Sequence, residues 1–415
     1  MAWRNRFNQG EAGAQSTQPL ARRFAAAHVA QVAAQLATHV AAQMAVVAAA
    51  CFALAACSTA DDASADARAK AAAAAVAPLP KGTVIPVGDA PAGLDISADS
   101  KWLYATSNGD NTLAVVDLSA RNVSKTIDGH APAKTSDDCT DNLCRGVGAV
   151  GVAVDANGHR AYVTSLRQDS VAFVDLDKGR ILRTIKAQRF PQNIVLSPDG
   201  RRAYVFNVVS NTVSVFETAN GRPSGRLALK GGDAHDQPFG RAVGLALSAD
   251  GKRLFVTNGV AGTVEVFNTA NRRLAGSIDA AGALDLQVDP HGGNLLVLGR
   301  DGITEYDAQT LKPASTLHFC GTPTIYHFAL SPDGSTLALT LPQDGVVASV
   351  ARDTGKVTGG YAAGDAPQAL RYTPDGATLA VVSNGGVVLF DTSDRSGAAA
   401  LVAKQGQLFC PAAAN

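Results

Sequence analysis

The sequence predicts an all-β fold, a seven-bladed β-propeller of four-stranded antiparallel blades. The main observation is a tight turn that recurs seven times between residues 97 and 376, with Ser197-Pro-Asp-Gly200 as its clearest copy. In such turns Pro presets φ, Asp or Asn hydrogen-bonds back to the backbone, and Gly accepts a positive φ. The last residues of consecutive turns are 58, 42, 51, 41, 42 and 42 positions apart. The basic period is therefore 42 residues with two insertions, which is typical of propeller blades.

Each repeat contains short apolar segments that alternate as β-strands do, and none has helical periodicity. In the second repeat the turn is followed by strand segments at 161–164, 171–175 and 181–185. The segment Thr83–Val87 has the character of a fourth strand that lacks the rest of its blade. We expect this segment to pair with the last blade and close the ring, and we predict no helix in the domain.

The first 80 residues differ from the repeats. The uncharged stretch Met44–Ala56 is too short to span a bilayer comfortably, but it fits the apolar region of an export signal. It ends in Leu54-Ala-Ala-Cys57-Ser58, which resembles the lipobox of bacterial lipoproteins, whose cysteine is acylated. We therefore predict a signal peptide at 1–56, lipidation of Cys57, a flexible tether at 57–80 and the propeller at 81–415. An ordinary signal peptide that contains a cysteine is the alternative.

The second strand of several repeats carries a recognisable motif. It reads Tyr162-Val-Thr164, Tyr204-Val-Phe-Asn207 and Phe255-Val-Thr-Asn258, each after the repeated turn and before a strand of the pattern TVxVF. These repeats resemble the YVTN-type β-propeller family, and the resemblance covers residues 83 to about 405. It implies the fold rather than one activity, because similar repeats occur in periplasmic and surface-layer proteins, in a nitrite-reductase haem d1 propeller and in lactonase-type enzymes.

The cysteines are consistent with export. Once the leader is removed, Cys57 is available for lipid and four others remain, an even number that an oxidising compartment would join in two disulfides. Cys139 and Cys144 close a small loop, and Cys320 and Cys410 pair by elimination, which would pin the C-terminal tail across the propeller mouth. Zinc binding is the alternative, but the spacing lacks a second matching pair and nearby histidines.

Composition argues against nucleic acid as a partner. The chain has 36 basic and 36 acidic residues, and neither sign forms a long run that could follow phosphates or an anionic lipid surface. We predict no cofactor and no metal site. The absence of a Cys-x-x-Cys-His motif argues against covalently attached haem.

The two insertions and the starts of the first strands give the candidate site. The insertions, Gly129–Arg145 and Gly231–Gly240, fall between blades and should lie on one face beside the central channel, where they either build a binding surface or are tolerated loops. The first strands should line the channel. Their polar candidates for ligand binding are Arg189, Gln192, Asn193, Arg241, Asp285, Tyr326, His327 and Gln368. The corresponding residues of the first two repeats are small (Ala92, Gly93, Val150 and Gly151), which predicts an open wall on that side. The simpler interpretation is a water-filled channel with polar lining.

We expect a non-enzymatic cell-envelope lipoprotein that binds a protein partner or a small ligand on the insertion-bearing face. The membrane would be contacted through the lipid anchor only, and Ser58 after the cysteine favours a periplasm-facing position at the outer membrane. One alternative is a lactonase-type hydrolase, with Arg189, Arg241, Asp285 and His327 around a sugar-acid lactone. A third is a haem-binding redox propeller with His327 as ligand.

Overall fold

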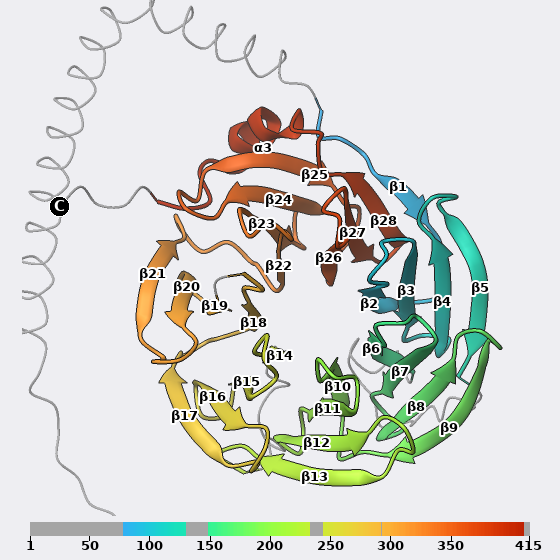
Figure 1. Cartoon of the computed structure of the whole chain (residues 1–415). Coiled ribbons are helices and arrows are strands. Elements are labelled where there is room, and N and C mark those ends of the chain that lie inside the picture. The colour runs from blue at the N-terminus through green and yellow to red at the C-terminus, as the bar shows by residue number, and fades with distance from the viewer. Residues whose placement is uncertain (1–77, 130–147, 233–243, 292, 411–415) are drawn as a thin grey trace, which may run out of the picture. The chain divides into compact units, whose positions relative to one another are not determined.

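The computed structural model describes residues 78–129, 148–232, 244–291 and 293–410, and these form seven four-stranded antiparallel sheets around a central channel (Figure 1). The predicted seven-bladed β-propeller is therefore confirmed. Residues Val76–Asn415 constitute one compact unit. In six blades the strands follow one another from the channel to the rim, so the first strand is innermost and the fourth is outermost.

The strand boundaries show how regular the repeat is. The first three blades comprise β2 (Pro91–Ile96), β3 (Trp102–Ser107), β4 (Thr112–Asp117) and β5 (Asn122–Asp128); β6 (Ala149–Val154), β7 (Arg160–Ser165), β8 (Ser170–Asp175) and β9 (Arg180–Lys186); and β10 (Pro191–Leu196), β11 (Arg202–Asn207), β12 (Thr212–Glu217) and β13 (Pro223–Ala228). The next three comprise β14 (Leu245–Leu247), β15 (Arg253–Asn258), β16 (Thr263–Asn268) and β17 (Leu274–Asp279); β18 (Asp285–Val288), β19 (Asn294–Leu298), β20 (Gly302–Asp307) and β21 (Pro313–His318); and β22 (Phe328–Leu330), β23 (Thr336–Leu341), β24 (Val346–Ala351) and β25 (Val357–Ala362). Blade seven comprises β26 (Leu370–Tyr372), β27 (Thr378–Ser383), β28 (Gly386–Asp391) and β1 (Thr83–Ile85).

Blade seven closes the ring with strands from both ends of the domain. β1 pairs antiparallel with β28, with Thr83 opposite Leu389 and Ile85 opposite Val387. This is the pairing predicted from the isolated strand at the start of the repeats. Because the last blade needs residues from both ends, the ring is completed only when the whole domain has folded.

The repeated turn is held by its own side chains. In blade three the Ser197 hydroxyl accepts a hydrogen bond from the Arg202 backbone N–H at 2.9 Å and donates one to Asp199. Gly200 then adopts a φ of 66°, a region that glycine reaches without a steric penalty. The equivalent turn of blade four shows the electrostatic effect, because the Ser248 hydroxyl and the Lys252 N–H lower the pKa of Asp250 to about 2. These contacts are local, which is why the turn could be recognised from sequence.

Neighbouring blades are joined through a threonine of the second strand. The Thr164 hydroxyl accepts a hydrogen bond from the Gly151 N–H at 2.8 Å and donates one to the Gln192 carbonyl of the next blade at 2.7 Å. Gly151 has no room for a side chain, since a Cβ there would lie 2.1 Å from the Gln192 oxygen. We call this arrangement the threonine bridge, and Thr106 repeats it between blades one and two.

The C-terminal segment departs from the prediction that the domain has no helix. After β28 the chain forms helix α3 (Gly397–Gln405) outside blade six, against β25 (Figure 1). Leu401 is fully buried there, and a Cβ on Gly360 of β25 would approach its side chain within 2.9 Å. The segment GAAALVAKQ is rich in alanine, which favours a helix, and β1 already occupies the fourth position of blade seven.

The Cys320–Cys410 disulfide is present, but it lies at the rim and not across the channel mouth. Cys320 follows β21, the outermost strand of blade five, and its backbone N–H donates to the Leu408 carbonyl at 2.8 Å. The Phe319 and Phe409 rings lie 4.9 Å apart beside it. The expected course of the tail over the mouth was therefore wrong, because these backbone and aromatic contacts hold the tail on the outer edge. Cys57, Cys139 and Cys144 lie outside the described residues.

The threonine bridge predicts the effect of a near-isosteric substitution. Thr164→Val should lower the free energy of unfolding by about 1–3 kcal/mol, because the buried Gly151 N–H and Gln192 carbonyl both lose their partner. Thr164→Ser keeps the hydroxyl and should retain most of the stability. Urea denaturation of the two variants checks this, and equal losses in both would contradict a hydrogen-bonding role.

The rim disulfide predicts a second loss of stability. Replacing both Cys320 and Cys410 by Ser should cost about 2–4 kcal/mol, since the bond constrains a 90-residue separation in the unfolded chain. The measurement is the denaturation midpoint, together with mass spectrometry of a non-reduced digest. An unchanged midpoint, or the absence of the cross-linked peptide from the native protein, would count against it.

Candidate functional site

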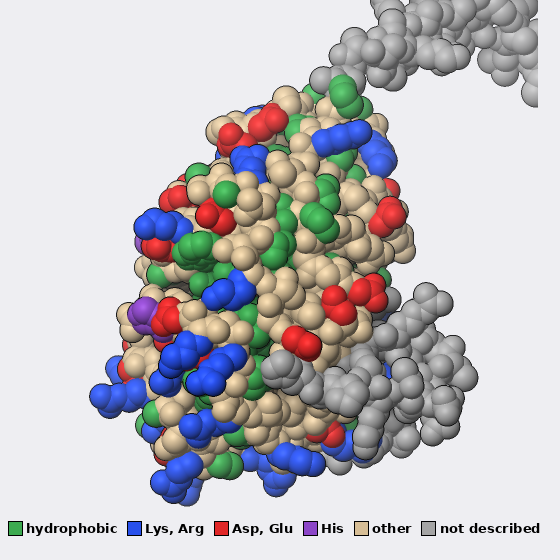
Figure 2. All heavy atoms as spheres, turned by 90° about the vertical axis from the view of Figure 1, so that its right-hand side faces the viewer, with side chains coloured by type: hydrophobic (Ala, Val, Ile, Leu, Met, Phe, Trp, Pro, Cys, Tyr) green, Lys and Arg blue, Asp and Glu red, His purple; other side chains and the backbone are tan. Residues whose placement is uncertain are grey.

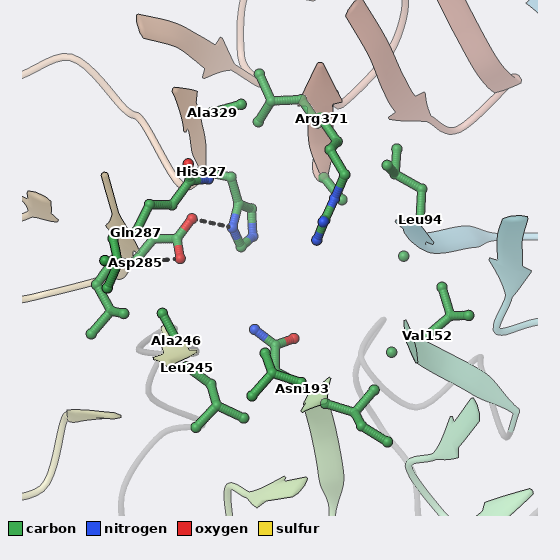
Figure 3. Close-up of a pocket in the computed structure, with 18 of the residues that line it drawn as sticks. Leu94, Val152, Asn193, Leu245, Ala246, Asp285, Gln287, His327, Ala329 and Arg371 are labelled. Atoms are coloured by element: carbon green, nitrogen blue, oxygen red, sulfur yellow. Dashed lines mark hydrogen bonds and ion pairs between the residues drawn. The ribbon is translucent and has the colours of Figure 1, made fainter. Parts of the chain in front are cut away.

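The central channel encloses a cavity of about 640 Å³ lined by the first strands of all seven blades. Along these short strands the side chains alternate between the blade interfaces and the channel. Leu94, Val152 and Leu245 form apolar parts of the wall, while polar groups gather on other strands (Figure 3). The wall of the cavity is thus mixed, with apolar side chains beside backbone and side-chain polar groups.

His327 and Asp285 form the most defined polar pair in the channel. His327 Nδ1 lies 3.2 Å from Asp285 Oδ2, and the two side chains are 29% and 13% exposed. A carboxylate can only accept, so Nδ1 carries the proton and the other ring nitrogen, on the channel side in Figure 3, is an acceptor in the neutral imidazole. This arrangement orients the imidazole as a hydrogen-bond acceptor or proton acceptor toward the cavity.

The backbone of His327 is fixed by the second strand of its own blade. The Thr340 hydroxyl lies 3.2 Å from both the backbone N and the carbonyl oxygen of His327. This is the position of Thr164 in blade two, and the residue opposite it there is Gly151. His327 therefore occupies a column in which blades one, two and four carry glycine, and its side chain turns toward Asp285, which has the same place in the preceding blade.

Arg371 reaches into the channel from β26 of blade seven, the neighbour of the blade that carries His327. Its Nη1 lies 3.1 Å from Asp95 Oδ1, and its side chain is 55% exposed while that of Asp95 is 13% exposed. Asp95 also accepts a hydrogen bond from the Val154 N–H of the next blade at 2.8 Å. The ion pair therefore holds one terminal nitrogen of the guanidinium group, and Figure 3 shows this group reaching toward the channel centre, where His327 and Asn193 also point.

Gln287 serves the scaffold. Its amide nitrogen donates to the Phe328 carbonyl at 2.6 Å and its oxygen accepts from the Leu330 N–H at 3.0 Å. The side chain thereby satisfies two backbone groups of blade six from blade five. Its polar atoms are occupied, so it is less available to a ligand than His327 or Arg371.

Of the eight predicted ligand-binding residues, five line the cavity, two do not, and Arg241 lies outside the described residues. Gln192, Asn193, Asp285, His327 and Gln368 belong to its wall. Arg189 and Tyr326 precede their strands and are not part of the wall. Arg241 and the bulk of both insertions are outside the described residues.

Sequence reasoning missed Asp95, Gln287 and Arg371. Each lies between two apolar residues of a first strand, as in Leu286-Gln287-Val288. The signal was available, since a polar residue at the centre of an apolar-x-apolar triplet faces the side opposite to its neighbours. Our prediction considered the start of each first strand and did not continue along it.

The small residues of blades one and two were predicted to leave one wall of the channel open, but the structure shows that they have a packing role. A Cβ on Gly93 would lie 2.1 Å from the Val150 carbonyl oxygen, just as one on Gly151 would meet Gln192. These glycines are required because adjacent first strands approach closely. Their small size is therefore explained by the threonine bridges and not by space for a ligand.

No group of three or more His, Cys, Asp or Glu side chains suited to a metal ion is found among the residues that the structure describes. Within the same residues no helix is long and apolar enough to cross a membrane. His327, Asn193 and Arg371 can supply hydrogen bonding, ion pairing and proton transfer in the described channel.

Comparison with known proteins points to the same fold. The model of the family described as lactonase, seven-bladed β-propeller, matches residues 151–304. The matched segment contains Asp285 and ends before His327. Two curated relatives, the uncharacterized protein YncE of Salmonella typhimurium strain LT2 and that of Salmonella typhi, are each 27% identical over 177 residues. Each alignment covers 43% of this chain and spans 44% of the relative's length.

Solved structures match over a larger share of the chain. Hydrazine synthase of Kuenenia stuttgartiensis superposes with a TM-score of 0.62 at 18% identity, covering 74% of this chain and 96% of that one. The Cps50 (Swd1) β-propeller domain of Myceliophteria thermophila gives 0.59 at 15% identity, covering 76% and 100%. At these identities the likeness shows the fold alone.

The His327–Asp285 pair predicts a spectroscopic result. In the native protein neutral His327 should be the Nδ1–H tautomer, because Asp285 accepts that proton. Asp285→Ala removes the acceptor, so the fraction of the Nε2–H tautomer should rise. Long-range nitrogen–proton NMR correlations report the tautomer, and His159, which pairs with Asp177 at 2.9 Å outside the channel, should not change. An identical His327 pattern in the variant would contradict the pairing.

Proposed function

We propose that this chain is an exported, lipid-anchored propeller with YVTN-type repeats that binds a small polar ligand in its central channel. The observation that carries the proposal is the convergence of His327, Asn193 and Arg371, from three different blades, on one cavity. A hydrogen-bond acceptor, an amide and a cation around one cavity suit a ligand that has hydroxyl groups and one acidic group. A sugar acid has that chemistry.

The size of the cavity supports a small ligand. Ligand pockets typically enclose about 300–1,000 Å³, with an apolar wall and a few placed polar groups. The channel cavity measures about 640 Å³, within this range, and its mixed polar and apolar wall suits a polar ligand. It is much smaller than a protein partner needs, so a partner protein would have to bind elsewhere on the domain.

The envelope location rests on the leader sequence and on the cysteines. Cys57 follows the apolar stretch 44–56 in a lipobox-like context, and acylation there would tether the domain to a membrane. The Cys320–Cys410 disulfide supports export, since stable disulfides are typical of oxidising compartments. We place the protein on the periplasmic side of the outer membrane, with the lipid as its anchor.

Hydrolysis of a sugar-acid lactone is the second candidate, favoured by the orientation of His327 and by the lactonase family match. In this reaction the free His327 nitrogen takes a proton from water, and the water oxygen attacks the lactone carbonyl carbon. The ring C–O bond then breaks and the leaving alkoxide takes the proton back from the imidazolium. Arg371 would stabilise the oxyanion, and Asp285 would stabilise the imidazolium.

The test combines binding with hydrolysis on the domain 76–415. Gluconate at one hundred times its dissociation constant should stabilise the native protein by about 2.7 kcal/mol, a clear thermal shift. Asn193→Ala and His327→Ala should each weaken this binding about tenfold, because each loses one hydrogen bond to the ligand. The matched control is His159→Ala, which removes a histidine paired with Asp177 outside the channel.

The outcomes separate the two functions. Binding without turnover of gluconolactone supports the binding protein, whereas turnover that is lost in His327→Ala and retained in His159→Ala supports the hydrolase. Channel binding is contradicted if gluconate and other sugar acids give no shift, or if the control weakens binding as much as the channel variants do.

A further inference from the structure

Positive charge is concentrated in one part of a chain that has no net charge. Residues 178–230 hold ten Lys or Arg and two Asp or Glu, a formal surplus of eight positive charges. The rest of the chain carries the compensating negative charge, because the totals are 36 and 36. No run of consecutive like charges reveals this, since the basic residues are spaced along two blades.

The fold brings these residues to the rim of blades two and three. We call the group the basic edge; it consists of exposed side chains on or beside the outermost strands β9 and β13, namely Arg180, Arg183, Lys186, Arg222, Arg226 and Lys230. Figure 2 views the molecule from the side and shows Lys and Arg side chains gathered in its lower part, with few acidic ones among them.

The two strands form one continuous surface. The Arg183 guanidinium of blade two donates to the Asn220 carbonyl of blade three, and the Arg272 guanidinium of blade four donates to the Ser224 carbonyl. Among the residues that the structure describes, no carboxylate lies within ion-pair distance of Arg180, Lys186 or Arg226. Their charges are available to a partner.

The chemistry of the basic edge favours a phosphate-bearing surface. Leu182, at 41% exposure, lies on β9 between Arg180 and Arg183, so an apolar side chain is flanked by cations. Interfacial binding to anionic membranes combines these two features. Exposed aromatic side chains, on which single-stranded nucleic acids stack, are absent from β9 and β13.

We propose that the basic edge docks the domain on an anionic phospholipid bilayer. The part of this idea that concerns nearness to the membrane rests on the proposed acylation of Cys57. Residues 57–77 precede the first described residue and could span about 70 Å if fully extended, so the tether permits this edge to reach the bilayer. Each Lys or Arg at an anionic surface contributes about a fivefold gain in affinity.

The test measures vesicle binding of the domain 76–415, which forms one compact unit whose ring is closed by its own strands. This domain carries no acyl group, so failure of the anchor and failure of the basic edge give different results. It should bind vesicles that contain phosphatidylglycerol, should not bind pure phosphatidylcholine, and should dissociate as salt is raised.

Two triple variants that change the net charge equally show whether the residues of the basic edge are responsible for vesicle binding. Arg180→Glu, Lys186→Glu and Arg226→Glu together should weaken binding at least about tenfold. The control combines Lys312→Glu, Lys356→Glu and Lys404→Glu, which are exposed at the rim of blades five and six and on α3. It should stay within about twofold of the native protein, and circular dichroism should show that both variants fold.

Three results would overturn the proposal. Equal losses in the two triple variants would mean that total charge matters and the basic edge does not. Binding to phosphatidylcholine as tight as to phosphatidylglycerol would exclude an electrostatic origin. Tighter binding of a single-stranded oligonucleotide than of anionic vesicles, abolished in the basic-edge variant, would assign the surface to nucleic acid.

Discussion

The close approach of the seven inner strands is the constraint on which the rest of the structure depends. Where a threonine such as Thr164 bridges two blades, the facing residue is Gly151, and any Cβ there would overlap the carbonyl of the next blade. Blade six uses the same threonine position, Thr340, to hold the backbone of His327. The candidate functional histidine therefore stands in a column in which blades one, two and four carry glycine, and blades three and five contribute Asn193 and Asp285 to the site.

Local chemistry explains which parts of the fold could be predicted. The turns depend on residues at most five positions apart, as for Ser197 and Arg202, so the seven repeats and the isolated first strand were recognisable. Helix α3 follows the last repeated turn and belongs to no repeat, so the repeat pattern did not predict it, although its segment is rich in alanine. The course of the tail is decided at a distance, by the contact of Phe409 with Phe319 at the rim.

The sequence prediction of the candidate site used only the residues at the start of each innermost strand. Asn193, Asp285 and His327 reach the cavity, whereas Arg371 was missed although its central place in an apolar triplet marks it as facing the channel. The side-chain pairs of the channel could not be predicted from the sequence. His327 and Asp285 are 42 residues apart, and Arg371 and Asp95 lie in the last and first blades.

The ring geometry also relates the channel to the basic edge. Outermost strands such as β9 and β13 form the circumference of the propeller, while the first strands surround an axis that runs through its centre (Figure 1). A domain that rests on its circumference has this axis parallel to the bilayer. The ends of the channel then face the aqueous space and not the lipid. Membrane docking through the rim of blades two and three is thus compatible with entry of a soluble ligand to His327 and Arg371. The rim and the open ends of the channel face perpendicular directions, so docking leaves the channel open.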